Sequence, residues 1–176
     1  MSIATKKITF CGLSIALAFI CSYIKVFSMP TSGSVTLLSM FFICMPGLIY
    51  GGYVGIVSSF AFACITYVVS GYYVSIPQII CDYFLAFGLM GACGFLTENK
   101  IDISIAFCFG CFIRFVFSTI SGIMFFADYA PENINPIIYS ITYNGLYIFA
   151  EMVITLILLN IPSTRRLLNN IRQMSK

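Results

Sequence analysis

Long apolar runs are the feature of this sequence that most limits what it can fold into. Of its 176 residues, 60% are apolar and only 9% are charged, against roughly 25% charged residues in an ordinary soluble domain. A helix needs about 20 mostly apolar residues to cross a bilayer, so the chain has length for about five to seven crossings and little else. An ordinary soluble domain is therefore excluded.

Turn-forming segments divide these runs into six predicted transmembrane helices, in a single integral membrane domain of residues 1–176. Proline, glycine and serine mark a loop at 27–34 and a turn at 70–77, and the charged stretch TENKID marks a loop at 97–102. We interpret the basic N-terminal lead and the run after it as a retained first span. The second span contains Pro46-Gly47, so we expect it to be kinked or broken. The predicted spans of this all-α membrane protein are 8–26, 35–50, 51–69, 76–96, 103–126 and 137–159.

The distribution of Lys and Arg predicts how these spans are oriented. With six crossings, both termini and the 97–102 loop lie on one side and carry all but two of the nine Lys and Arg residues. The exceptions are Lys25, on the opposite side, and Arg114, inside a span. Because cytoplasmic loops are rich in Lys and Arg, both termini are predicted to be cytoplasmic and the protein to lie in the cell membrane.

Residues of the usual catalytic and metal-binding kinds are scarce. The chain has no His, and its eight Cys all fall inside apolar runs, where small apolar packing accounts for them. Cys108 and Cys111 form the one C-x-x-C pair. With no triad, carboxylate cluster or phosphate-binding loop, we predict that the protein is not an enzyme, holds no metal or cofactor and binds no nucleic acid.

Polar residues between 114 and 151 predict a pocket near the outer surface. A loop at 127–136 joins two spans that each carry polar side chains, and ionisable residues inside spans are functional-site candidates because they are costly there. Residues spaced by four share one face of the fifth span: Arg114, Ser118, Gly122 and Phe126. The sixth span is interrupted by Tyr139, Tyr143, Asn144 and Glu151.

Asp82 is the residue on which the predicted ligand chemistry depends. It lies about 9 Å below the outer end of the fourth span, and Asn144 lies about 10 Å down the sixth, at a rise of ~1.5 Å per residue. A carboxylate among aromatic rings favours a flat organic cation, and an amide suits the edge of a heterocycle. Two other readings stay open: Asp82 as an acid near a helix N-terminus, and the tyrosines as an interfacial aromatic belt.

Arg114 and Glu151 lie deeper than Asp82. Their predicted depths are roughly 18 and 21 Å, by the same helical rise. This match predicts an ion pair between them, which would leave Asp82 without an internal partner.

The first span carries small residues that permit close helix contact. Gly12 and Ala16 form one row, and Ser14, Ala18 and Ser22 form an offset row. Such rows serve either packing within the chain or docking of another membrane protein.

The residues themselves leave three functions open. One is a ligand-binding membrane subunit, and another is an autonomous proton-coupled carrier that titrates Asp82 or Glu151. The third is a purely structural membrane subunit. No inverted repeat is detectable, which makes the carrier the weaker option.

The chain resembles the substrate-binding S components of energy-coupling factor (ECF) vitamin transporters, most of all the thiamine-specific family. The resemblance covers nearly the whole chain and implies an ECF S-component-like bundle. Three groups of residues carry it: Tyr72, Asp82 and Tyr83; Arg114, Ser118, Gly122 and Phe126; and Tyr129-Ala130-Pro131 leading to Tyr139-Ser140 and Asn144-Gly145.

This resemblance implies roles for individual residues. In the thiamine-specific family, the position of Asp82 is usually a Glu that meets the cationic thiazolium, and the positions of Ser118 and Phe126 are commonly His and Trp. The shorter acid and smaller ring leave open thiamine in a changed pose or a related ring such as its pyrimidine precursor. Pocket-lining positions of the family correspond to Tyr72, Tyr83, Tyr139 and Asn144.

The resemblance also implies partners. In that family the small-residue face of the first helix, here Gly12 and Ala16, docks onto a membrane coupling subunit that works with two cytosolic ATPases. The implied function is capture of thiamine, or of a related ring compound, at the outer face of a bacterial plasma membrane and its ATP-driven delivery to the cytoplasm.

Overall fold

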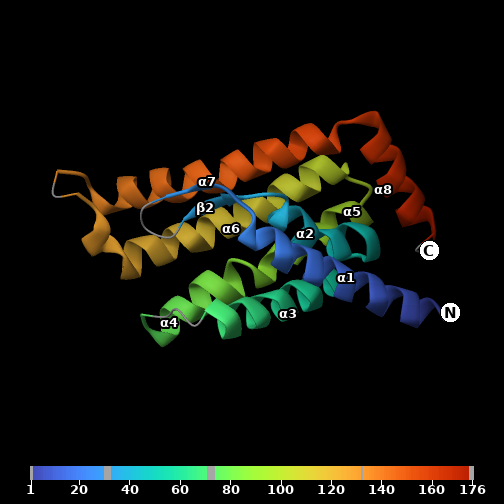
Figure 1. The fold of residues 1–176 in the computed structure, drawn as a ribbon, viewed down its shortest axis with the longest axis horizontal. Helices are drawn as coiled ribbons and strands as arrows, with labels where there is room; N and C mark the ends of the chain where they lie inside the picture. The colour runs from blue at the N-terminus through green and yellow to red at the C-terminus, as the bar shows by residue number, and fades with distance from the viewer. Residues whose placement is uncertain (1, 30–32, 71–73, 132, 175–176) are drawn as a thin grey trace.

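The computed structural model describes residues 2–29, 33–70, 74–131 and 133–174 and shows a bundle of long helices. The two ends of the chain lie at the same end of the bundle (Figure 1). The helices are α1 (Ile3–Tyr23), α2 (Ser39–Tyr50), α3 (Gly52–Ser70), α4 (Ile76–Ile79), α5 (Gly94–Glu98), α6 (Ile103–Phe125), α7 (Pro136–Leu159) and α8 (Pro162–Met174). Shorter turns are the π-helical η1 (Ile80–Leu85) and the 3₁₀ segments η2 (Gly88–Cys93) and η3 (Ala127–Tyr129).

Five helical segments of the described chain are long and apolar enough to cross a membrane. They correspond to five of the six predicted spans and are Ile3–Tyr23, Gly52–Ser70, Ile76–Glu98, Ile103–Phe125 and Pro136–Leu159. The predicted second span is shorter than expected, because α2 has 12 residues and contains Pro46. At ~1.5 Å per residue such a helix covers about 18 Å, less than the ~30 Å of a hydrocarbon core.

The segment before α2 corrects the sequence prediction of a plain loop at 27–34. Strands β1 (Lys25–Ser28) and β2 (Ser34–Thr36) form an antiparallel hairpin, with Lys25 opposite Thr36 and Ser28 opposite Ser34. The first helix consequently ends at Tyr23 rather than at residue 26, and the chain is not all-α. The strands are rich in Val, Phe and Thr, which suit extended backbone.

Glycines allow α2, α3 and η2 to cross closely. A Cβ on Gly47 would lie 3.2 Å from the Cα of Gly55, and a Cβ on Gly91 would collide with the backbone of Gly55. Residues without a side chain at these positions are therefore what lets the three segments approach so closely. Gly51 adopts a φ of 97° between α2 and α3, a conformation that residues with a side chain rarely adopt.

The C-terminal tail forms a helix that the sequence analysis did not predict. In α8, Arg172 donates a hydrogen bond to the carbonyl of Thr97, and Arg165 lies 3.4 Å from the Asp102 carboxylate. Leu168 is buried against the core of the bundle. The tail therefore packs beside the charged 97–102 loop, at the end of the molecule that carries both chain ends (Figure 1).

The core lies where α2, α3, η2, α6 and α7 meet. Its largest fully buried side chains include Phe62, Phe107, Met40 and Ile148. All eight cysteines are free thiols, and Cys44, Cys93 and Cys111 are buried among these side chains. The Cys108 and Cys111 thiols are not joined.

Candidate functional site

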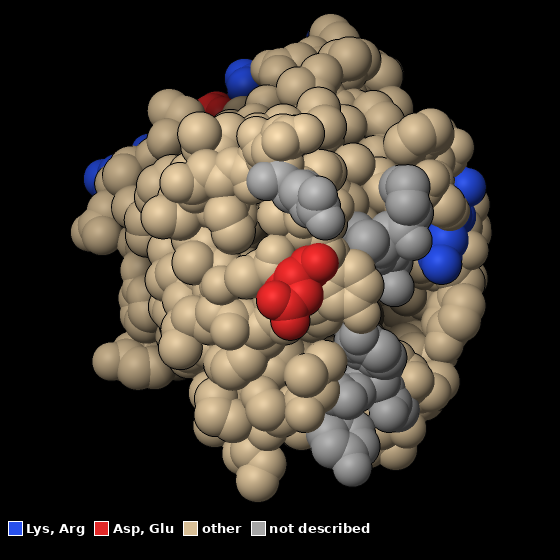
Figure 2. Space-filling view, turned by 90° about the vertical axis from the view of Figure 1, so that its left-hand side faces the viewer, with Lys and Arg blue, Asp and Glu red and all other residues tan. Residues whose placement is uncertain are grey.

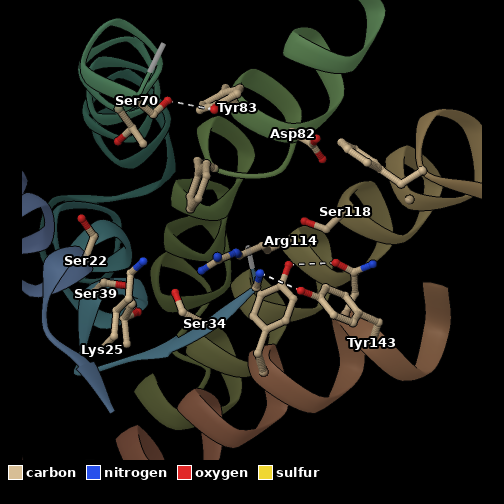
Figure 3. A pocket seen from close by; sticks show the side chains of 18 of the residues that line it. Ser22, Lys25, Ser34, Ser39, Ser70, Asp82, Tyr83, Arg114, Ser118 and Tyr143 are labelled. Atoms are coloured by element: carbon tan, nitrogen blue, oxygen red, sulfur yellow. Dashed lines mark hydrogen bonds between the residues drawn. The ribbon is translucent and has the colours of Figure 1, made fainter. Parts of the chain in front are cut away.

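A cavity of about 680 Å³ lies between the hairpin, the end of α1, α3, the segment Gln78–Phe87, α6 and α7. It receives side chains from segments that are far apart in the sequence, and Figure 3 shows several of them directed toward its interior. Among the described residues, the face of the molecule opposite the chain ends is largely uncharged, with acidic atoms near its middle and basic atoms at its margin (Figure 2). This face fits the side that the Lys and Arg distribution assigns to the outside.

Asp82 lies in the π-helical turn η1 and lines the cavity. Gln78, one turn earlier and itself 2% exposed, donates a hydrogen bond from Nε2 to Asp82 Oδ2 at 2.6 Å. Among the described residues, no Lys or Arg nitrogen lies within 4.0 Å of the Asp82 oxygens. The carboxylate thus faces the cavity with a neutral amide as its hydrogen-bond partner, as expected for an acid without an internal ion pair.

Tyr83, next to Asp82, fixes η1 against α3. Its hydroxyl lies 2.9 Å from the Ser70 hydroxyl, and its ring packs edge-on against Tyr67 with centroids 5.4 Å apart. Both Ser70 and Tyr83 line the cavity. These contacts define the orientation of the turn that carries Asp82.

Asn144 forms the opposite wall of the cavity together with α6. Its Oδ1 accepts a hydrogen bond from the Tyr147 hydroxyl at 2.8 Å, and its Nδ2 donates to the Ser140 carbonyl at 3.0 Å. A Cβ on Gly122 would collide with the Ser140 hydroxyl, so glycine at 122 is what lets α6 and α7 approach here. Contacts within the protein therefore hold the amide in a fixed orientation.

Aromatic rings from α7 continue this wall. Tyr139 and Tyr143 stack with centroids 5.7 Å apart, and Tyr143 meets Tyr147 edge-on at 6.0 Å. Phe126 and Tyr129 form a further pair at 5.9 Å. Flat, electron-rich surfaces therefore line the same space as the Asp82 carboxylate.

The predicted ion pair between Arg114 and Glu151 is wrong. The Arg114 guanidinium lies over the Phe87 ring at 4.5 Å and over the Tyr147 ring at 5.7 Å, and its buried Nε has no hydrogen-bond partner. Glu151 instead accepts hydrogen bonds from the segment that leads into α2. Equal depth along two helices does not fix the direction in which each side chain points, and here they point to different neighbours.

Residues 8–169 match the model of a protein family described as thiamine transporter protein (Thia_YuaJ). The chain belongs to this thiamine transporter family. This match confirms the family that the resemblance in the sequence predicted. Its members' membrane location agrees with the long apolar helices, so the chain is a multi-pass bacterial membrane protein.

Individual relatives support this membership in the thiamine transporter family. The chain is 28% identical to the thiamine transporter ThiT of Bacillus subtilis (strain 168) over 146 residues, which cover 75% of this chain and 76% of that protein. A solved structure of ThiT from Listeria monocytogenes superposes with a TM-score of 0.80, covering 95% of this chain and 99% of that one, at 17% identity. The structural match shows the shared fold.

The cavity of this thiamine transporter family member brings together eight of the nine predicted binding residues. Tyr72 lies outside the described residues. Gly12 and Ala16 are exposed on α1, away from the cavity. The residues that line the cavity are Asp82, Tyr83, Arg114, Ser118, Gly122, Phe126, Tyr139 and Asn144.

Sequence reasoning missed several lining residues. Lys25, Gly33, Ser34 and Thr36 come from the hairpin, whose strands are too short to be distinguished from a loop in the sequence. Tyr147 and Phe87 also belong to the wall, and the four-residue spacing of Tyr139, Tyr143 and Tyr147 could have identified Tyr147. The remaining missed residues include Thr66 and Gln78.

Proposed function

We propose that this chain is the substrate-binding S component of an ECF-type importer and that it binds thiamine in the 680 Å³ cavity. The observation that carries the proposal is the Asp82 carboxylate, which faces the cavity and receives its hydrogen bond from the neutral amide of Gln78. Membership of the thiamine transporter family supports the identity of the ligand.

The chemistry of the site suits a permanently charged aromatic ring. A cation about 4 Å from a carboxylate gains roughly 4 kcal/mol at an effective dielectric constant of about 20. The stacked rings of Tyr139 and Tyr143 add a surface for a flat ligand. Thiamine contains a cationic thiazolium and a neutral pyrimidine, so Asp82 accounts for the first and the aromatic wall for the second.

Arg114 supports one orientation of that ligand. Its guanidinium belongs to the cavity lining and repels a cation. Guanidinium N–H groups can donate to an uncharged hydrogen-bond acceptor on the ligand, whereas the thiazolium cation does not suit them. We therefore place the thiazolium toward Asp82 and the acceptor-bearing part of thiamine toward Arg114.

We also propose that the chain crosses the membrane six times with both ends in the cytoplasm. Support comes from the Lys and Arg residues gathered near the chain ends and the 97–102 loop. The short helix α2, continued by the hairpin, serves as the second crossing in this topology. The cavity then opens toward the outside, where a nutrient is captured.

The proposed partners are a membrane coupling subunit and two cytosolic ATPases. Among the residues of α1, only Ser14 and Ala18 are buried. The row of small residues to which they belong therefore packs within the chain. A Cβ on Gly12 would meet nothing within 4 Å, and Ala16 is exposed beside it. This smooth exposed row suits close packing against a helix of another membrane protein.

A substitution on this row tests the partner proposal. Gly12→Leu is expected to abolish thiamine uptake by cells that contain the coupling subunit and ATPases. Binding of thiamine by the purified variant is expected to equal that of the parent, because Gly12 lies outside the cavity. Leu13→Ala, an exposed change next to the row, serves as the control, and unchanged uptake in Gly12→Leu would contradict the docking role.

The decisive experiment on the ligand is calorimetric titration of purified protein with thiamine. Asp82→Asn is expected to weaken binding about 100-fold or more, because a buried charge partner is lost. Asp102→Asn makes the same chemical change outside the cavity, and an Asn still caps α6 in its place. Undiminished binding by Asp82→Asn would remove the basis for the proposal.

The thiamine pyrimidine, titrated into the same proteins, separates the two ligands. It lacks the permanent cation, so Asp82→Asn is expected to change its affinity far less than that of thiamine. Tighter binding of the pyrimidine than of thiamine by the parent protein would assign the site to the precursor.

A further inference from the structure

Glu151 is a buried carboxylate that ligand recognition at Asp82 does not use. Its side chain is 1% exposed and accepts three hydrogen bonds. Thr36 Oγ1 donates to Oε2 at 2.6 Å, while Ser39 Oγ and the Met40 amide donate to Oε1, each at 2.9 Å. A carboxylate removed from water needs such donors, and all three come from one short segment of chain.

That segment joins the hairpin to α2. Thr36 is the last residue of β2, and Leu38 precedes the helix in a left-handed conformation, φ 64°, without a side-chain cap. The first amides of a helix have no partner within it. Glu151, on α7, therefore supplies the cap that the local sequence lacks, at the end of α2 where the peptide dipoles favour a negative group.

The same segment forms part of the cavity wall. Gly33, Ser34, Thr36 and Ser39 all line the cavity, and Figure 3 shows Ser34 and Ser39 on the side formed by the hairpin and α2, away from Asp82. A two-stranded hairpin is marginally stable by itself. Its position over the cavity therefore depends on contacts with the helices.

Two contacts with α7 fix this hairpin. Near its tip, the Gly33 amide donates to the Tyr143 hydroxyl at 2.7 Å. At its root, Thr36 and Ser39 donate to Glu151. Tyr143 and Glu151 are two turns apart on α7, about 12 Å at ~1.5 Å per residue. The root contact is buried and uses a charged acceptor, so it is the stronger of the two.

We propose that Glu151 is a positioning residue for ligand retention. By fixing the root of the hairpin to α7, it holds the strand β2 over the cavity and slows the departure of the bound ligand. The role in retention rests on the proposed function of the cavity, whereas the fixing of the hairpin does not. Glu151 itself does not contact the ligand in this role.

Three variants test this positioning role. Glu151→Leu removes every acceptor. Glu151→Gln keeps an oxygen for Ser39 and Met40, and its amide can donate to the Thr36 hydroxyl. Thr155→Val, one turn further along α7, removes an equally buried hydroxyl that bonds only to the backbone of its own helix, so it is the matched control.

The first measurement is the kinetics of thiamine binding. Glu151→Leu is expected to release thiamine about ten-fold faster or more, as the loss of hydrogen bonds to a charged group predicts. The association rate is expected to change little, because the Asp82 side of the cavity is untouched. Glu151→Gln should restore most of the slow release, and Thr155→Val should behave as the parent. Release from Glu151→Leu at the parent rate would overturn the proposal.

The second measurement is amide hydrogen exchange of residues 33–36 without ligand. Faster exchange confined to this segment in Glu151→Leu supports the role, and exchange equal to the parent overturns it. If Glu151→Leu does not fold, Thr36→Val replaces it in this measurement. Thr36→Val removes one of the three donors to Glu151, so a smaller increase in exchange is expected. Should the parent protein not bind thiamine, the proposed ligand fails and this exchange measurement still decides whether Glu151 fixes the hairpin.

Discussion

Asp82 and Glu151 are two carboxylates within apolar helices, and their surroundings differ. Glu151 is almost fully buried and accepts hydrogen bonds from Thr36, Ser39 and Met40. Asp82 faces a large cavity and accepts a hydrogen bond from Gln78. One acid has a complete set of internal donors, whereas the other faces open space lined by aromatic rings.

This difference supports our proposal that Glu151 is a structural acid and Asp82 a ligand-binding one. Burying a carboxylate is costly unless hydrogen bonds or an opposite charge compensate. At Glu151 the protein supplies that compensation from its own chain. At Asp82 a neutral amide supplies part of that compensation, and we propose that a positively charged ligand supplies the rest.

The largest expected effect concerns stability without ligand. Glu151→Ala leaves two hydroxyls and the Met40 amide without their acceptor, so we expect it to lower the free energy of unfolding by about 3 kcal/mol or more. Asp82→Ala leaves only the Gln78 amide without its acceptor, so its effect is expected to be smaller, about 1 kcal/mol. Chemical unfolding of the purified variants in detergent measures both.

The comparison fails if these two variants have the same stability. Equal losses would mean that Asp82 is as important to the fold as Glu151. Added thiamine sharpens the test, because it should raise the stability of the Glu151→Ala protein and leave that of Asp82→Ala nearly unchanged.

Much of the bundle and its binding wall could be predicted from the sequence, because both depend on periodic patterns. Apolar length identified the long helices, and four-residue spacing placed Arg114, Ser118, Gly122 and Phe126 on one face, which lines the cavity. Asp82 was identified because an acid is rare in such a run. These features are local, so neighbouring residues suffice to predict them.

The features that were missed depend on contacts between distant segments. The strands of the hairpin have only four and three residues, and the serines and glycine around them read as a loop. The donors to Glu151 lie more than 110 residues away in sequence, so only the fold reveals them. The similar depths of Arg114 on α6 and Glu151 on α7 suggested that they pair. Whether two side chains meet also depends on how each helix is rotated about its axis, which depth does not show.

A smaller effect is expected from changing Arg114, which also tests the comparison of Asp82 with Glu151. Arg114 lines the same cavity as Asp82 and takes no part in the hydrogen bonds of Glu151. Arg114→Gln removes the charge and the guanidinium donors from the cavity wall, and we expect thiamine to bind about ten-fold more weakly, as the loss of one charged hydrogen bond predicts. Arg165→Gln, the same change on the exposed α8, should leave binding unaltered. Calorimetric titration measures both affinities.

Exchanging the two charges between positions 114 and 151 tests whether Arg114 and Glu151 form an ion pair. If the two residues paired, Arg114→Glu combined with Glu151→Arg would recover the stability that each single change removes. The geometry predicts no recovery, because the guanidinium introduced by Glu151→Arg would face the donors of Thr36, Ser39 and Met40, which need an acceptor. Recovery in the double variant would show that the two charges meet in the membrane, and Glu151 would then no longer contrast with Asp82 as an acid satisfied by neutral donors.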